Sequence, residues 1–154
     1  MGIRHMPLLL VSLALSIAYG CSNRATATLE PGANLKAIKS YYVVHQPKDS
    51  HRIHELIRDK LVRDGLSATA GPELAQGSYK ADSIVTYVDR WMWDITLYLL
   101  QLTVTLRDAP TGFPLAVGDS YHTSLTRKSA EEMVDEVMTN IFNAAKNPPQ
   151  QATP

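Results

Sequence analysis

The longest apolar pattern in the chain covers residues 81–108, with the sequence ADSIVTYVDRWMWDITLYLLQLTVTLRD. It contains no glycine or proline, and it is rich in the β-branched and aromatic residues that fit a pleated sheet. Fully extended at about 3.3 Å per residue, it would reach roughly 90 Å, much longer than a strand of a small domain. The pattern therefore predicts two antiparallel strands that reverse direction near residues 91–94.

The second of these strands alternates in polarity, because successive side chains of a strand point to opposite faces. The face that we expect to be buried carries Tyr98, Leu100, Leu102, Val104 and Leu106. The opposite, wetter face carries Leu99, Gln101, Thr103, Thr105 and Arg107. Such an alternation is typical of a strand with one face on the core and the other toward water.

Two other segments repeat their apolar residues every three or four positions, which is typical of surface helices. The first predicted helix follows Asp49 or Ser50, either of which can cap it, and it ends at Gly65. The second follows Ser129, which can form a capping box with Glu132. The apolar stripes consist of Ile53, Leu56, Ile57 and Leu61 in the first helix, and of Met133, Val134, Val137, Met138, Ile141 and Phe142 in the second.

Residues 37–44, 66–70 and 113–123 have the composition of further strands, the last with a bulge expected at Gly118. The order of elements is then strand, helix, short strand, three strands and helix. It predicts an α+β fold, a two-layer sandwich in which a mainly antiparallel β-sheet carries two amphipathic helices on one face. We place this domain at residues 35–146.

The N-terminus has the features of a secretory signal over residues 1–20, with Arg4 before an apolar run of about a dozen residues, LLLVSLALSIAY. This run is too short to span a membrane. Cys21 follows as the only cysteine, so the chain cannot form an internal disulfide. We expect residues 21–34, which are small and polar, to be a flexible tether, and residues 147–154 to be a disordered tail.

The segment Ala18-Tyr19-Gly20-Cys21 resembles the cleavage site of a bacterial lipoprotein signal. The resemblance implies cleavage before Cys21, diacylglycerol on its sulfur and an acyl chain on the new amino group. Several acyl chains together give stable anchoring. Ser22, in place of an aspartate, implies an outer-membrane lipoprotein that faces the periplasm, or a cell-membrane one if the host has no outer membrane.

Charge and motifs add little chemistry. Fifteen basic and fifteen acidic residues give zero net charge, so nothing draws the chain as a whole to nucleic acid. His51 and His54 lack the spacing of a zinc hydrolase helix. Gly118-Asp119-Ser120 resembles the nucleophile block of one esterase family, but here it lies late in the chain and inside a strand. We therefore expect no catalytic residue, no metal and no cofactor.

Trp91-Met92-Trp93 is the one cluster that suggests a binding role. The aromatic rings either cover the end of the sheet or, together with Arg90, form a docking patch, because tryptophan and arginine are favoured anchors of interfaces. A reversal of the chain nearby would separate the two rings. We expect one ring to be packed and the other to be available to a partner.

Three blocks of the chain resemble a family of small bacterial envelope lipoproteins of unknown function. They are a helix that ends in Leu-x-x-x-Gly at Leu61 and Gly65, a strand that opens with Ala81-Asp82-Ser83-Ile84-Val85, and residues 104–118, VTLRDAPTGFPLAVG. The chain departs from the family where Leu115 or Val117 replaces a usual tryptophan. The resemblance supports the fold and the location, and it supplies no catalytic residue.

These observations predict a lipid-anchored, non-enzymatic envelope protein that binds another envelope component, with the membrane and an envelope protein as its partners. Two alternatives stay open at this point. One is an envelope hydrolase with an unrecognised active site, and the other is a subunit of an envelope transport or secretion assembly.

Overall fold

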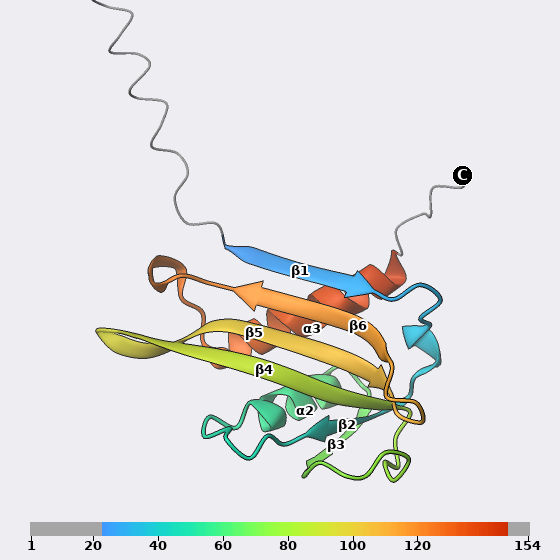
Figure 1. Ribbon diagram of the computed structural model, residues 1–154. Helices are drawn as coiled ribbons and strands as arrows, with labels where there is room; N and C mark the ends of the chain where they lie inside the picture. Colours follow the sequence, from blue (N-terminus) through green and yellow to red (C-terminus); the bar gives the residue numbers. More distant parts are fainter. Residues whose placement is uncertain (1–22, 148–154) are drawn as a thin grey trace, which may run out of the picture.

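Six strands form one open sheet in the order β1–β6–β5–β4–β2–β3, and both α-helices lie against the same face of it (Figure 1). The structure, a computed structural model, describes residues 23–147. The strands are β1 (Arg24–Leu29), β2 (Ser40–Val44), β3 (Ser67–Gly71), β4 (Ser83–Asp94), β5 (Thr96–Asp108) and β6 (Pro114–Tyr121). The helices are α2 (Ile53–Arg63) and α3 (Ala130–Lys146), with short 3₁₀ turns η1 (Leu35–Ala37) and η2 (Ser124–Thr126).

The predicted α+β architecture is confirmed, with a sheet that is mixed in direction. Neighbouring strands run antiparallel from β1 through β6 and β5 to β4, and parallel from β4 through β2 to β3. The parallel pair β2 and β3 is joined through α2, because parallel neighbours need a crossover connection and not a tight turn. Charged groups join the two helices: Arg63 on α2 lies 2.7 Å from Asp135 and 3.4 Å from Glu131 on α3.

The helices bury the apolar stripes that the sequence predicts. Ser129 and Glu132 form the expected capping box at the start of α3. Gly65, with a φ of 82°, ends α2, and the N–H of Leu66 donates to the carbonyl of Leu61, as in a Schellman motif. The cap at the start of α2 is different from the prediction: the N-cap is Arg52, and Asp49 accepts from the N–H of His51 and of His54.

The long hairpin of β4 and β5 corrects the predicted register at its outer end. The chain reverses at Ile95, whose φ is 59°, and not at residues 91–94, so both tryptophans belong to β4. A bulge then leaves Leu100 without a partner, because Arg90 pairs with Gln101 and Trp91 with Leu99. Leu99 therefore lies in the core, although alternation placed it on the wetter face; Leu102, Val104 and Leu106 are buried as predicted.

The segment expected to be a tether is partly a strand, because residues 24–29 form β1 and pair along β6 at the edge of the sheet. Ala27 and Leu29 pack against the core, so the domain begins before residue 35. The small and polar residues of this strand do not form a strand pattern in the sequence, and its backbone hydrogen bonds come from β6. The signal, the lipidation site at Cys21 and most of the expected tail lie outside the described residues.

Gly118 brings α3 close to the sheet, and it does not form the bulge expected there. The irregularity of β5 and β6 lies instead between Leu106 and Arg107. A methyl group on Gly118 would stand 2.8 Å from a side-chain carbon of Ile141 on α3. The glycine is therefore a packing requirement, and its φ is not in the left-handed region. Within residues 23–147, no helix is long and apolar enough to cross a membrane.

Candidate functional site

The outer end of the β4–β5 hairpin projects beyond both helices (Figure 1). Four large apolar side chains are exposed there: Met92, Trp93, Ile95 and Leu97. We call these four residues the hairpin end. Trp93 is 71% exposed and Ile95 is 86% exposed. A concentration of exposed apolar side chains on one protruding element is typical of an interaction surface.

The three residues predicted to form a docking patch do not lie together. Trp91 is half-buried, its indole stacks on His51 with ring centroids 3.7 Å apart, and its Nε1 donates to Asp89 at 2.7 Å. Arg90, its neighbour in the strand, points to the opposite face and donates to Gln101 at 3.1 Å. Of these three residues, only Trp93 belongs to the hairpin end, so the ring of Trp91 is packed and the ring of Trp93 is exposed.

Asp49 joins the start of α2 to β4. Its side chain is fully buried and accepts hydrogen bonds from the Tyr87 hydroxyl at 2.7 Å, from the His51 N–H at 2.8 Å and from Nδ1 of His54 at 3.1 Å. Burial by itself would raise the pKa of Asp49, but these hydrogen bonds outweigh it and lower the pKa to about 2. Asp49 is therefore a carboxylate at neutral pH.

His51 lies beside two carboxylates, and not beside His54 as in a two-histidine metal site. One ligand atom from each of Asp49, His51 and Asp89 lies within 4.8 Å of the others. His54 instead turns to Asp49 and lies against His45, with ring centroids 4.1 Å apart and the rings tilted by 36°. Because both carboxylates already accept hydrogen bonds from the protein, we assign to the cluster a structural role: it holds Trp91 and the first turn of α2 on β4.

Ser120, the serine of the esterase-like block, is buried under α3. Its hydroxyl donates to Oε2 of Glu136 at 2.6 Å, and Nε2 of His122 meets the same oxygen at 2.8 Å. The serine is thus bound to a carboxylate and is not paired with an imidazole that could take its proton. Burial favours a higher pKa of Glu136, but hydrogen bonds from Lys128, Ser120 and His122 lower it to about 2.

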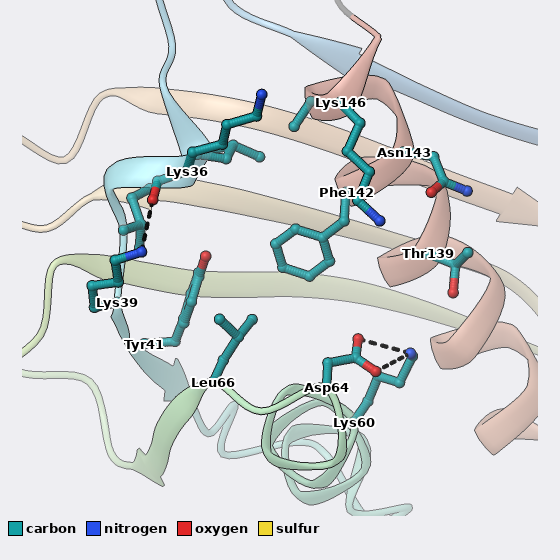
Figure 2. Close-up of a pocket in the computed structure, with 13 residues that line it drawn as sticks. Lys36, Lys39, Tyr41, Lys60, Asp64, Leu66, Thr139, Phe142, Asn143 and Lys146 are labelled. Atoms are coloured by element: carbon teal, nitrogen blue, oxygen red, sulfur yellow. Dashed lines mark hydrogen bonds and ion pairs between the residues drawn. The ribbon is translucent and has the colours of Figure 1, made fainter.

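A groove of about 610 Å³ opens between η1 and β2 on one side and the C-terminal turns of α2 and α3 on the other (Figure 2). Its apolar lining includes Leu35, Ile38, Leu66 and Phe142. Four lysines surround it: Lys36, Lys39, Lys60 and Lys146. Sequence reasoning missed this groove because α3 lies far along the chain from η1, β2 and α2, and no local motif marks the lining.

Tyr41 forms part of the inner wall of the groove. The residue is 1% exposed, and its hydroxyl is buried without a hydrogen-bond partner. The ring of Phe142 stands edge-on to it, with centroids 6.3 Å apart. Burial, assisted by the negative charge of Asp82, raises the pKa of Tyr41 to about 12. The hydroxyl therefore keeps its proton at physiological pH and can donate a hydrogen bond.

The sequence matches no protein-family model and none of the curated proteins with which it was compared. Among solved structures, the chain is similar to the PelC dodecamer from Paraburkholderia phytofirmans in space group P6. The TM-score is 0.58 at 15% sequence identity, over 78% of this chain and 98% of that chain. A point variant of that dodecamer in space group C2 gives a TM-score of 0.55 at 15% identity, over 79% and 98%.

A weak structural neighbour is a minor lipoprotein from Acinetobacter baumannii. Its TM-score is 0.33 at 15% identity, over 71% of this chain and 94% of that chain. This likeness is too small to support an argument about either fold or function. The likeness to PelC, at 15% identity, shows a shared fold and no more than that.

Proposed function

We propose that the chain is a lipid-anchored accessory protein of a bacterial cell envelope that acts by assembly and not by catalysis. In this proposal, Cys21 carries the lipid and holds the domain on the periplasmic side of the outer membrane. The folded domain joins other copies of itself, and the assembly then serves another envelope component. The exposed apolar hairpin end is the observation that carries this proposal.

The hairpin end has the properties of a subunit contact. Trp93, Ile95 and Leu97 lie within a few residues of one another, and each leaves about half or more of its surface exposed. Monomeric proteins rarely expose large apolar patches that have no role. A second copy of the chain is the occupant that we favour, because PelC, which shares the fold, is a dodecamer in two different space groups.

The test is the oligomeric state of the full-length lipoprotein in detergent, measured by native mass spectrometry or sedimentation. We expect the native chain to be a homo-oligomer and the double variant Trp93→Ser/Ile95→Ser to dissociate. Phe113→Ser is a matched control, because Phe113 is 72% exposed and Trp93 is 71% exposed, but Phe113 lies outside the hairpin end. A monomeric native chain, or equal dissociation of the control, would contradict the proposal.

The anchor has a separate test, since Cys21 lies outside the described residues. Cys21→Ser should abolish the incorporation of labelled fatty acid, and the variant should stay uncleaved or be released as a soluble form. If the native protein takes up no label and Cys21→Ser still fractionates with membranes, the lipid anchor is wrong.

Of the two alternatives, the envelope hydrolase disagrees with this proposal and the subunit of a larger assembly is compatible with it. The hydrolase gains no support from Ser120, because that hydroxyl is bound to Glu136. A subunit of an envelope transport or secretion assembly agrees with a protein that works by self-association. Its partners would be found by affinity purification of the tagged lipoprotein from solubilised envelopes, with the hairpin-end variant as the comparison.

A further inference from the structure

The groove between η1, β2, α2 and α3 has the size and lining of a site for a small amphipathic molecule. Pockets for small ligands are typically about 300–1,000 Å³ and mostly apolar, with a few polar groups that fix the ligand. This groove has a volume of about 610 Å³ and apolar walls that include Leu66 and Phe142. The polar groups that line it are the hydroxyl of Tyr41, the ammonium groups of the four lysines, and the side chains of Asp64, Thr139 and Asn143.

The Tyr41 hydroxyl is the first group that points to a ligand. It is aimed into the groove between the side of Lys39 and the ring of Phe142 (Figure 2). A buried hydroxyl without a partner destabilises a folded protein, because it has lost its hydrogen bonds to water and gained none. An acceptor on a bound molecule would supply that hydrogen bond. Phe142, which is partly buried and stands edge-on to Tyr41, is the apolar side chain beside that hydroxyl.

The lysines around the groove indicate the sign of the charge on the bound molecule that supplies this acceptor. Lys60 is bound to Asp64, with its Nζ 2.7 and 2.8 Å from the two carboxylate oxygens. Lys36, Lys39 and Lys146 are different, because none of them forms an ion pair with a side chain in residues 23–147. Two of these three lysines come from the η1–β2 side and the third from α3, so they face the groove from both sides (Figure 2).

We propose that the groove binds an amphipathic anion, a molecule with one hydrocarbon chain and a carboxylate or phosphate head. The head lies between Lys36, Lys39 and Lys146 and accepts a hydrogen bond from Tyr41. The hydrocarbon part lies along Leu66 and Phe142. Both a fatty acid and a lysophospholipid have this chemistry. The site is independent of the proposed assembly, because the hairpin end lies outside its lining.

The test is calorimetric titration of the full-length lipoprotein in nanodiscs of zwitterionic lipid, with empty nanodiscs as the blank. The probes are octanoate, octyl phosphate and octyltrimethylammonium, which share a chain and differ in the head. We expect at least one of the two anionic probes to bind saturably to the protein. We expect no binding of the cationic probe. The tighter of the two anions identifies the source, a carboxylate or a phosphate head. Equal binding of anion and cation, or no binding of any probe, would overturn the proposal.

Three variants test the residues. Lys36→Gln/Lys146→Gln should weaken anion binding about tenfold or more, because it removes two charged donors. Lys80→Gln is the matched control, since Lys80 is exposed and lies outside the groove lining. Tyr41→Phe should weaken binding while the melting temperature stays the same or rises, because the variant removes an unpartnered hydroxyl. Unchanged binding by both the lysine and the tyrosine variants would assign the groove no ligand role.

The inference and the proposed function fail separately. Trp93→Ser/Ile95→Ser, which is expected to dissociate the assembly, should bind the anionic probe with the affinity of the native chain. Conversely, Lys36→Gln/Lys146→Gln should keep the native oligomeric state. A hairpin-end variant that loses the probe while it stays folded would show that the binding depends on the assembly, and would contradict the separate site proposed here.

Discussion

The inner and outer halves of the β4–β5 hairpin have similar apolar composition and opposite environments. In the inner half, Val85 and Tyr87 on β4 and Leu102 and Val104 on β5 are buried beneath the helices. In the outer half, the hairpin end is exposed, although it is as apolar as the inner half. The difference lies in the cover, because the helices reach over only the inner half of the hairpin (Figure 1). An apolar strand is therefore buried or exposed according to what lies on it.

The boundary between the halves is built by polar groups and by a bulge. Asp49 binds Tyr87 on the inner side, and His51 stacks on Trp91 where the register shifts. A bulge increases the local twist of a strand. The outer half of the hairpin thus twists away from the rest of the sheet near Trp91, where His51 and the start of α2 lie against β4.

The largest effect that would distinguish the two halves is expected at Leu102. This side chain is fully buried, and Leu102→Ala should lower the free energy of unfolding by about 2–5 kcal/mol. Small domains have only about 5–15 kcal/mol of stability, so denaturant unfolding would show the loss clearly. Leu97→Ala, in the same strand but at the exposed end, is the matched control and should change stability by about 0.5 kcal/mol or less. Equal effects of the two variants would abolish the distinction.

The two tryptophans repeat the comparison within one strand. Trp91→Ala should lower the free energy of unfolding by about 2 kcal/mol, because it removes a half-buried ring and its stacking on His51. Trp93→Ala should cost about 0.5 kcal/mol or less, since that ring is mostly exposed. Emission and quenching of the single-tryptophan variants provide a second measurement. The Trp93→Ala protein should emit at shorter wavelength and be quenched less than the Trp91→Ala protein, and the reverse order would contradict the structure.

Gly118 tests how closely the inner half of the sheet is packed beneath α3. Gly118→Ala should lower the free energy of unfolding by about 1–3 kcal/mol, because the added methyl group would meet Ile141 at 2.8 Å. The double variant Gly118→Ala/Ile141→Val should recover part of this loss, because valine frees space at the point of contact. If Gly118→Ala melts like the native protein, α3 does not lie as close to β6 as the structure has it.

The smallest expected effect is a loss of stability at acid pH, when Asp49 at the boundary between the two halves becomes protonated. The pKa of Asp49 is lower in the folded protein, about 2, than its ordinary value of 3.8. The contribution of ionised Asp49 to the free energy of unfolding is therefore fully present at a pH above 3.8, and it is lost as the pH falls toward about 2. Asp49→Asn should flatten the fall in stability over this range in denaturant titrations. Glu136 has a similarly low pKa, so Glu136→Gln is the parallel variant, and part of the pH dependence should survive each single change.

The sequence by itself determined the elements whose signals are local. The stripes of both helices, the capping box at Ser129 and the C′ glycine at Gly65 each depend on residues a few positions apart. Local hydrogen bonds and helical spacing decide these features, whatever the rest of the chain does. The α+β class followed from the order of such elements.

Only the tertiary structure decided the features that depend on distant partners. Residues 24–29 become β1 because β6 offers its edge. Alternation placed Leu99 on the wetter face, because the bulge that shifts the register opposite Trp91 leaves no mark in the local pattern. The groove brings Lys36 and Lys146 together from opposite ends of the domain, and the exposure of Trp93 depends on where the helices end. A strand takes its hydrogen bonds, and an apolar side chain its cover, from other parts of the chain, so the local pattern does not contain these outcomes.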